Sequence, residues 1–123
     1  MVTLPDLAEK HGGLGAIRDW GRVLSLGEQQ RIGFARMLVS HPKLVFLDEA
    51  TSAVDFAMET HLYQLLVRSG ASFVSIGHRL SILDYHTHVL TLIAGGGWKL
   101  GPLTSAGAEE AKGCLDPDVI TPV

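Results

Sequence analysis

One short segment limits the possible folds more than any other part of the chain. Leu44 to Leu47 is continuously apolar, and Asp48 and Glu49 follow it directly. A run that is apolar on both faces is typical of a buried parallel strand. Phe56 to Arg68 then has the periodicity of a helix, and Ser72 to Ile76 has the length of another strand. This alternation predicts an α/β domain with a mostly parallel sheet flanked by helices.

The rest of the chain continues the same pattern. Ser25 and Glu28 have the spacing of a capping box, which predicts a helix that starts at Ser25 and ends before Pro42. We expect a flexible tail at residues 104–123, which are rich in Gly, Ala and Pro, after an ordered part at residues 1–103. The other expected elements are helices at Leu4 to His11 and Ser81 to Tyr85, strands at His88 to Ile93 and Trp98 to Leu100, and a connector from Gly15 to Val23.

Composition argues against several classes of protein. The chain is 46% hydrophobic, as in ordinary globular proteins, and its net charge is -3 without any dense run of Lys or Arg, so we expect no nucleic-acid partner. Its apolar stretches fall short of the ~20 residues of a membrane span, so membrane association would need another segment or another chain. The single cysteine, Cys114, cannot form an internal disulfide.

Three groups of residues could carry chemistry. In open α/β sheets, sites lie beyond the carboxyl ends of the strands, where we expect both the Asp48–Glu49 pair and His78. One carboxylate could hold Mg²⁺ and the next could orient or deprotonate a water, while the imidazole could donate to a phosphate oxygen. Ser25 and Gly27 open a helix whose backbone N–H groups could meet an anion.

Each feature alone also has a simpler interpretation. An acid pair can merely mark the end of a strand, and the Ser-x-x-Glu spacing usually belongs to an ordinary capped helix. An isolated histidine such as His78 is more often structural. A metal site at His86 and His88 is disfavoured, because structural metal sites need several ligands.

Taken together, the motifs resemble those of the ATP-binding domain of ABC transporters. Leu24 to Arg31 is similar to the signature motif, and Leu44 to Glu49 is similar to the Walker B strand with its catalytic glutamate. Ser52 to Asp55 resembles the D-loop, and Gly77 to Arg79 resembles the segment of the switch histidine. The order and spacing of all four match the family. The resemblance implies the C-terminal portion of a P-loop NTPase domain, with the N-terminal half missing.

Finer matches resemble subfamily D of these transporters and its bacterial and plastid relatives. They are Gly12-Gly13-Leu14, Asp19-Trp20, Phe34-Ala35-Arg36 and Tyr85-His86. The resemblance implies half-transporters that dimerise and move fatty acids, acyl-CoA thioesters or, in one branch, cobalamin. It also implies a transmembrane domain outside this chain, with the ATPase domain on the cytosolic or stromal side of the membrane.

The resemblance further implies ATP and Mg²⁺ as cofactors, and a second ATP-binding domain that packs head to tail with this one. Asp48 would act on Mg²⁺, Glu49 would polarise the attacking water, and His78 would hold the γ-phosphate. Glu49 and His78 are therefore the expected catalytic residues. The residues expected to meet the ATP of the opposite subunit, or to communicate across the dimer, are Ser25, Gly27 and Glu28 of the signature and Asp55 of the D-loop.

The sequence departs from the family pattern in two ways. Leu26 stands at the middle glycine of the signature, and Glu28 stands at its usual glutamine. The 123 residues also contain no G-x-x-x-x-G-K-S/T loop, which supplies most of the grip on the phosphates. We therefore expect no ATP hydrolysis by this chain alone. We also expect marginal stability, because the strand at Leu44 to Leu47 would have an unpaired, apolar neighbouring side unless another chain completes the sheet.

Two alternatives remain beside a transporter ATPase. One is an ABC-type ATPase of the DNA-repair or chromosome class. Three features disfavour it: the Glu49 to Asp55 stretch, the short spacing between signature and Walker B, and the lack of coiled-coil heptads. The other is a binding module without enzymatic activity, which would complete or poison the site of a whole ATPase domain.

Overall fold

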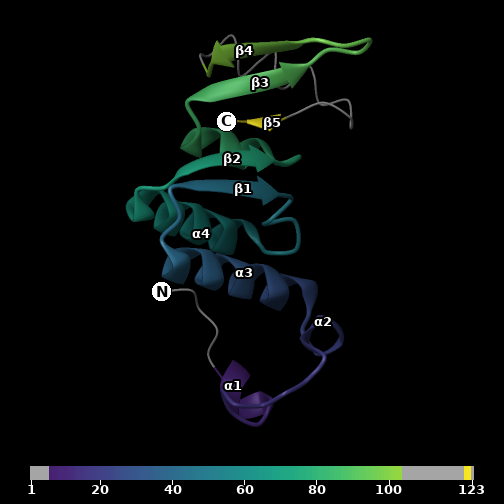
Figure 1. The fold of residues 1–123 in the computed structure, drawn as a ribbon, viewed down its shortest axis with the longest axis vertical. Helices are drawn as coiled ribbons and strands as arrows, with labels where there is room; N and C mark the ends of the chain where they lie inside the picture. The colour runs from purple at the N-terminus through teal and green to yellow at the C-terminus, as the bar shows by residue number, and fades with distance from the viewer. Residues whose placement is uncertain (1–5, 104–120, 123) are drawn as a thin grey trace.

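The middle of the chain folds as the sequence predicts. The computed structural model describes residues 6–103 and 121–122, and its longest helices are α3 (Leu26–Ser40) and α4 (Phe56–Ser69). Strands β1 (Leu44–Asp48) and β2 (Ser72–Ile76) precede and follow α4. As Figure 1 shows, the elements are stacked along the long axis, from α1 at one end to β4 at the other. The remaining elements are α1 (Leu7–Lys10), α2 (Trp20–Val23), the 3-10 helix η1 (Leu80–Tyr85), β3 (His88–Leu92), β4 (Trp98–Pro102) and β5 (Thr121–Pro122).

Polar side chains fix the starts of the two long helices. At α3, Ser25 Oγ accepts a hydrogen bond from the N–H of Glu28 at 3.2 Å, and the Glu28 carboxylate accepts one from the N–H of Ser25 at 2.8 Å. These reciprocal bonds confirm the predicted capping box. At α4, the Asp55 carboxylate accepts from the N–H of Met58 at 2.7 Å. The helix ends at Gly70, whose φ of 75° suits a residue without a Cβ.

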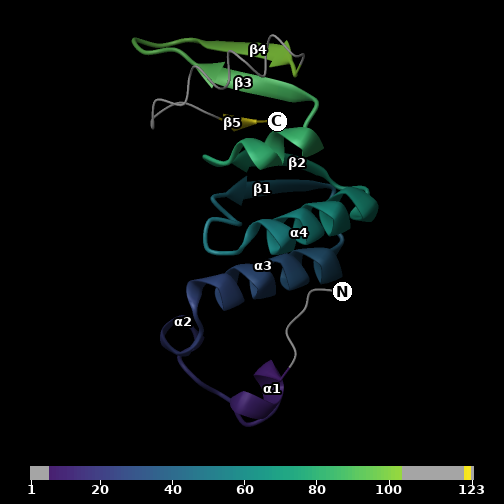
Figure 2. The same ribbon diagram turned by 180° about the vertical axis from the view of Figure 1, so that it is seen from behind.

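Strands β1 and β2 form a parallel pair that α4 connects. The register runs from Leu44 opposite Ser72 to Asp48 opposite Ile76, so the carboxyl ends of both strands meet at one edge. Figures 1 and 2 show α4 between α3 and this strand pair, with the first turns of both helices on the same side as the strand arrowheads. This side of the molecule therefore gathers two strand ends and two helix N-termini.

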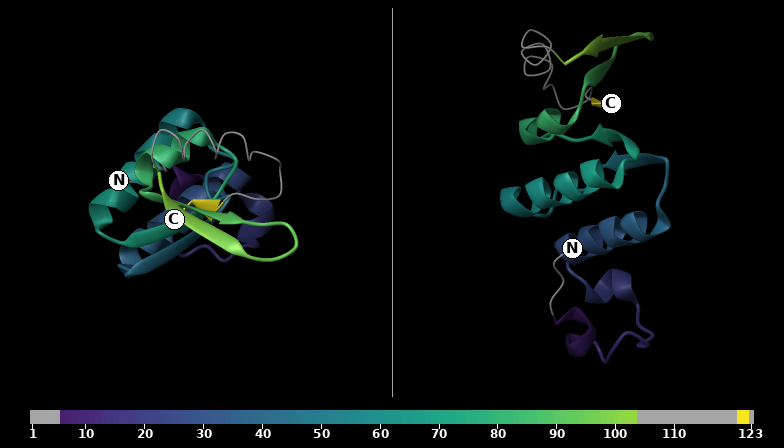
Figure 3. Two further views of the ribbon diagram at one scale, coloured as in Figure 1. Left: turned by 90° about the horizontal axis from the view of Figure 1, so that it is seen from above. Right: turned by 90° about the vertical axis from the view of Figure 1, so that its left-hand side faces the viewer.

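The expectation of a mostly parallel sheet is wrong for the part of the chain that follows His86. Strand β3 pairs antiparallel with β4 and with β5, in the order β4-β3-β5. A short turn with Gly95, Gly96 and Gly97 at φ of 88°, 105° and 108° joins β3 to β4. So short a link allows a hairpin, whereas parallel pairing needs a long crossover. Figure 3 shows this hairpin at the end of the molecule opposite α1.

Three smaller predictions also differ from the structure. Of the helix expected at Leu4 to His11, positions 4 and 5 lie outside the described residues, and the described part contains only α1, because Asp6 has a φ of 64° that a right-handed helix cannot continue. The connector expected at Gly15 to Val23 contains α2, whose Gly21 carbonyl accepts a hydrogen bond from Gln29 Nε2 of α3 at 3.1 Å. The predicted flexible tail lies outside the described residues except at 121–122, where β5 pairs with β3.

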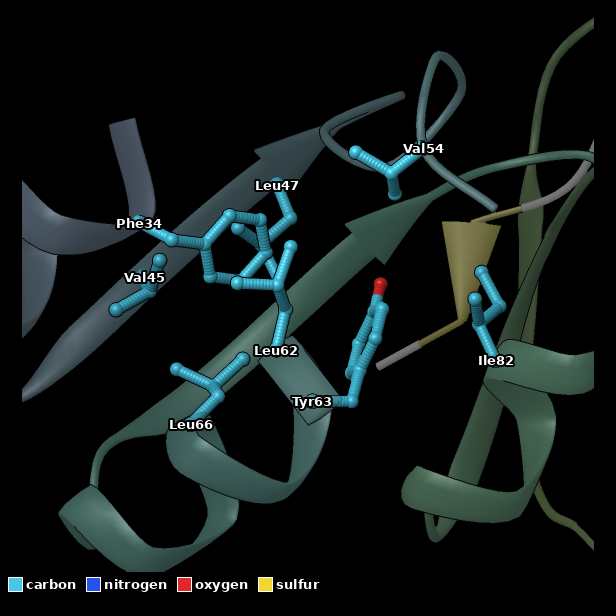
Figure 4. Packing of buried hydrophobic residues seen from close by; sticks show 8 residues of the cluster. All are labelled: Phe34, Val45, Leu47, Val54, Leu62, Tyr63, Leu66 and Ile82. Atoms are coloured by element: carbon cyan, nitrogen blue, oxygen red, sulfur yellow. The ribbon is translucent and has the colours of Figure 1, made fainter. Parts of the chain in front are cut away.

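The hydrophobic core lies between the two long helices and one face of the parallel pair. Leu62 and Leu66 of α4 are fully buried, and Val45 and Leu47 of β1 are buried against the helices. The intervening Phe46 is 74% exposed, so the opposite face of β1 is open within the described part of the chain. Figure 4 shows how the core side chains converge: Phe34, Val45, Leu47, Val54, Leu62, Tyr63, Leu66 and Ile82.

A chain of polar groups crosses the boundary between the core and η1. The Tyr63 hydroxyl donates to Ser75 Oγ at 3.0 Å, and Ser75 Oγ lies 2.9 Å from Nε2 of His86. Nδ1 of the same imidazole lies 2.7 Å from the Ile82 carbonyl oxygen, which can only accept, so Nδ1 carries the proton and Nε2 accepts from Ser75. The neutral form of His86 thus satisfies every member of the chain. Both ring nitrogens of His86 are thus engaged in hydrogen bonds within the protein.

We expect this histidine to make stability depend on pH. Burial lowers the pKa of His86 from its ordinary value of 6.5, so between the two values the unfolded chain binds more protons than the folded one. The contribution of His86 to the free energy of unfolding should therefore be fully present above about pH 6.5. It should decrease as the pH drops toward the folded pKa. Urea unfolding across this range measures the slope, and His86→Gln, which does not titrate, should show a smaller one. An equal slope in both proteins would contradict the assignment.

Candidate functional site

The carboxyl ends of β1 and β2 bring Glu49 and His78 together. Asp48 is in register with Ile76, and the N–H of Glu49 donates to the Ile76 carbonyl at 2.9 Å. Nε2 of His78 then lies 2.8 Å from Oε1 of Glu49, across 29 positions of sequence. Because an ionised carboxylate can only accept, Nε2 carries the proton in this contact. The two predicted catalytic residues are therefore neighbours.

Glu49 has an unusual backbone conformation. Its φ of 44° lies in the left-handed region, which costs a residue with a side chain on the order of 1–3 kcal/mol and is common at functional sites. The side chain is 49% exposed. It borders a hollow of about 230 Å³, which we call the strand-end hollow. The polar residues lining it are Glu49, Thr51, Ser52, Glu59, Tyr63, His78 and Arg79.

Asp48 lies beside this hollow and not in it. As the last residue of β1 it is exposed, and it lines a separate hollow of about 310 Å³ together with Gln30 and Phe34 of α3. Successive residues at a strand end point in opposite directions, which explains the separation from Glu49. The structure thus brings Glu49 and His78 into one place and leaves the predicted Mg²⁺ residue on the α3 side.

Two of the predicted signature residues, Ser25 and Gly27, line a third hollow of about 430 Å³ together with Asp55, whereas Glu28 does not line it. Gly27 has to be a glycine here, because a Cβ atom would lie 2.9 Å from the Ala53 carbonyl oxygen. Glu28 uses its carboxylate on the N–H of Ser25, and this hydrogen bond lowers the pKa of Glu28. The structure therefore joins the signature to the D-loop residue and keeps both apart from Glu49 and His78.

Three residues of the site did not emerge from the sequence. Glu59 is 1% exposed, and its carboxylate accepts hydrogen bonds from Thr51 at 2.7 Å, from Arg79 at 3.3 Å and from the hydroxyl of Ser81. Arg79 also donates to the carbonyls at positions 52 and 54, at 3.1 and 2.9 Å. The third residue, Gln30, bonds to the turn at residues 49–53. A signal for Glu59 was available: it shares a helical face with the buried residues 62, 63 and 66.

Two structural searches of the described residues gave negative results. No helix among them combines the length and the apolar character needed to cross a bilayer. No group of three or more His, Cys, Asp or Glu side chains in residues 6–103 and 121–122 is arranged to hold a metal ion.

Comparison with known proteins identifies the family. Residues 6–52 match the model of the ABC transporter family, and this segment runs from α1 through the signature helix to the turn after β1. The chain belongs to the ATP-binding domains of ABC transporters. It is 46% identical over 104 residues to an uncharacterized ABC transporter ATP-binding protein of Synechocystis, a match that covers 85% of this chain and 16% of that protein.

Other relatives place this ABC ATP-binding domain in subfamily D. It is 50% identical over 91 residues to the chloroplastic ABC transporter D family member 2 of Arabidopsis thaliana, covering 74% of this chain and 13% of the relative. It is 43% identical over 102 residues to the human lysosomal cobalamin transporter ABCD4, covering 81% of this chain and 17% of the relative. The chain thus spans less than a fifth of the length of each of these relatives.

The family implies ATP with Mg²⁺. The side chains at the ends of β1 and β2 fit the metal and the attacking water of such a site. An exposed carboxylate at Asp48 suits Mg²⁺, and the Glu49–His78 pair suits a water and an anionic oxygen. A lysine that grips the β- and γ-phosphates is not found at this edge of the described structure. The described lysines are Lys10 in α1, Lys43 before the start of β1 and Lys99 in β4.

Proposed function

We propose that this chain supplies the signature, Walker B, D-loop and switch-histidine segments of an ATP-hydrolysing domain that powers transport across a membrane. One observation carries the proposal. Glu49 and His78 converge to 2.8 Å at the carboxyl ends of two parallel strands, with Glu49 in a left-handed conformation that orients its carboxylate away from the line of β1. Strained backbone of this kind is concentrated at active sites and ligand clamps.

The roles of the residues follow from this geometry. Asp48, in the hollow beside α3, would hold the magnesium ion, which when bound would neutralise charge on the phosphates. Glu49 uses one carboxylate oxygen on His78 and offers the other to the proton of a water. Nε2 of His78 donates to Glu49 in this structure, and its proton would turn to an anionic oxygen of the phosphate when ATP is bound. Ser25, Gly27 and Glu28 form the start of α3, which we propose meets the ATP held by a second ATP-binding domain, with Asp55 beside that contact.

The wider assignment rests on the relatives. We propose that residues 1–103 form the C-terminal part of the ATP-binding domain, that a transmembrane domain and a second ATP-binding domain are the partners, and that the site faces the cytosol or stroma. We propose fatty acids or acyl-CoA thioesters as cargo. A subfamily D relative bears the name of a cobalamin transporter, so a cobalamin is the competing cargo.

A hybrid protein tests the proposal. The ATP-binding region of the Synechocystis relative would be kept, and its segment of 104 matched residues would be replaced by this chain. We expect the hybrid to hydrolyse ATP, because the relative then supplies a phosphate-binding loop while this chain supplies Glu49 and His78. A soluble, folded hybrid that binds ATP but does not hydrolyse it would contradict the proposal.

The 123-residue chain by itself should behave differently. It contains no phosphate-binding loop, and we expect no ATP hydrolysis above that of its Glu49→Gln variant. The measurement is phosphate release from Mg-ATP with both purified proteins. Turnover that depends on Glu49 would show that other residues of the chain grip the phosphates, and would overturn this part of the proposal.

A further inference from the structure

The turn that carries Glu49 is attached to the signature helix by one side chain. Nε2 of Gln30 donates to the Glu49 carbonyl at 3.1 Å and to Ser52 Oγ at 2.9 Å. Oε1 of Gln30 accepts from the N–H of Ala53 at 3.0 Å. One amide therefore holds both ends of the turn at residues 49–53, using its donors and its acceptor together.

These bonds restrain the backbone of Glu49, and this backbone sets the direction of the Glu49 carboxylate. On one side, the N–H of Glu49 is held by the Ile76 carbonyl of β2 at 2.9 Å. On the other side, its carbonyl is held by Gln30 at 3.1 Å. The φ of 44° is unfavourable for a glutamate, so the residue needs such restraints to keep it there. The Glu49 carbonyl also accepts from the N–H of Ser52 at 3.1 Å, within the turn itself. Loss of the Gln30 bond therefore removes the only one of these two restraints that comes from α3, and the Glu49 carboxylate gains freedom to move away from His78.

A backbone contact also ties the same turn to α3. A Cβ atom on Gly27 would lie 2.9 Å from the Ala53 carbonyl oxygen, so the helix and the turn are packed as closely as a glycine allows. Ala53 is thus held by its N–H through Gln30 and by its carbonyl against Gly27. A displacement of the first turns of α3 is therefore transmitted to the turn and to Glu49.

We propose that Gln30 is a positioning residue that couples the signature helix to the catalytic Glu49 of the same domain. The inference rests on the proposed function, since it gives Gln30 a task only where Glu49 acts on a water. Gln30 acts through Glu49 and needs no contact with the nucleotide. Its effect is therefore on the rate of the chemical step and not on the affinity for ATP.

The neighbouring Gln29 provides a matched control. It is also on α3, but its Nε2 donates to the carbonyls of Gly21 and Leu24 at 3.1 and 2.9 Å. Gln29→Leu removes the same amide from the same helix without touching the turn at residues 49–53. The two variants therefore separate a general loss of a glutamine from the loss of the link to Glu49.

The first experiment compares both variants in the hybrid described above. Gln30→Leu should lower kcat on the order of tenfold and leave KM for ATP within about twofold, because a displaced catalytic group loses rate and not binding. Gln29→Leu keeps the turn at residues 49–53 attached to α3, so its loss of kcat should be clearly smaller than that of Gln30→Leu. Equal kcat in Gln30→Leu and the unmodified hybrid, or a loss confined to KM, would overturn the positioning role.

The second experiment needs no ATP hydrolysis. In the full 123-residue chain, amide hydrogen exchange at Ala53 should be about tenfold faster in Gln30→Leu than in Gln29→Leu, because only the former removes its acceptor. An unchanged exchange rate would overturn the inference by itself. Lack of activity in the unmodified hybrid would instead overturn the proposed function, so the two failures can be told apart.

Discussion

Replacing Glu49 by Gln is expected to lower kcat of the hybrid ATPase by about 10²- to 10⁴-fold, the usual contribution of a general base. The amide has nearly the shape of the carboxylate and still accepts a hydrogen bond from Nε2 of His78, which the structure places 2.8 Å from Oε1. It cannot accept a proton from water near neutral pH. The change thus removes the chemistry while keeping the geometry, and KM for ATP should change little.

The measurement is steady-state phosphate release over a range of ATP concentrations. Glu9→Gln is the control, since Glu9 is an exposed carboxylate on α1. Figure 1 shows that α3 and α4 lie between α1 and the strand pair β1–β2 that carries Glu49. It should retain the full kcat. A Glu49→Gln hybrid with more than about a tenth of the original kcat would show that another group accepts the proton.

Replacing Glu59 by Ala should have the largest effect on stability. Its carboxylate is 1% exposed and accepts from Thr51, from Ser81 and from the guanidinium of Arg79. Its removal leaves the hydroxyls of Thr51 and Ser81 and one N–H group of the Arg79 guanidinium without this acceptor, and it opens space in the core. We expect a loss of about 3 kcal/mol, in the range measured for breaking buried polar and ionic contacts.

Urea unfolding of the full chain, followed by circular dichroism, checks this value. Glu59→Gln keeps an acceptor of the same shape without the charge, so its loss should be smaller than that of Glu59→Ala. Glu9→Ala should be within about 0.5 kcal/mol of the original chain, because exposed side chains away from special features contribute little. A Glu59→Ala chain as stable as Glu9→Ala would show that the buried network does not support the fold.

The loss of Glu59 should also affect the site. Arg79 follows His78 directly and joins the Glu59 carboxylate to the carbonyls of Ser52 and Val54. The buried carboxylate thus fixes the turn at residues 52–54 and the segment that holds His78 relative to each other. Gln30 fixes the same turn from the other side, so the strained Glu49 is held between α3 and the network of Glu59.

The sequence determined the local features of this protein. The capping box at Ser25 and the apolar run of β1 predicted their elements correctly, because caps and periodicity depend on a few neighbouring residues. The four motifs in order identified the family for the same reason. The sequence also suggested that Glu49 and His78 share a site, since parallel strands end at one edge.

The tertiary structure decided the features that depend on distant residues. The strands β3 and β4 were predicted, but their antiparallel pairing and the pairing of β5 were not, because strand pairing depends on open neighbouring edges as well as on local pattern. The roles of Gln30, Arg79 and Glu59 were missed too, since their hydrogen bonds join residues up to 27 positions apart. Local pattern fixes which residues can form an element, whereas only packing decides which polar side chains meet and so which ones hold the site in place.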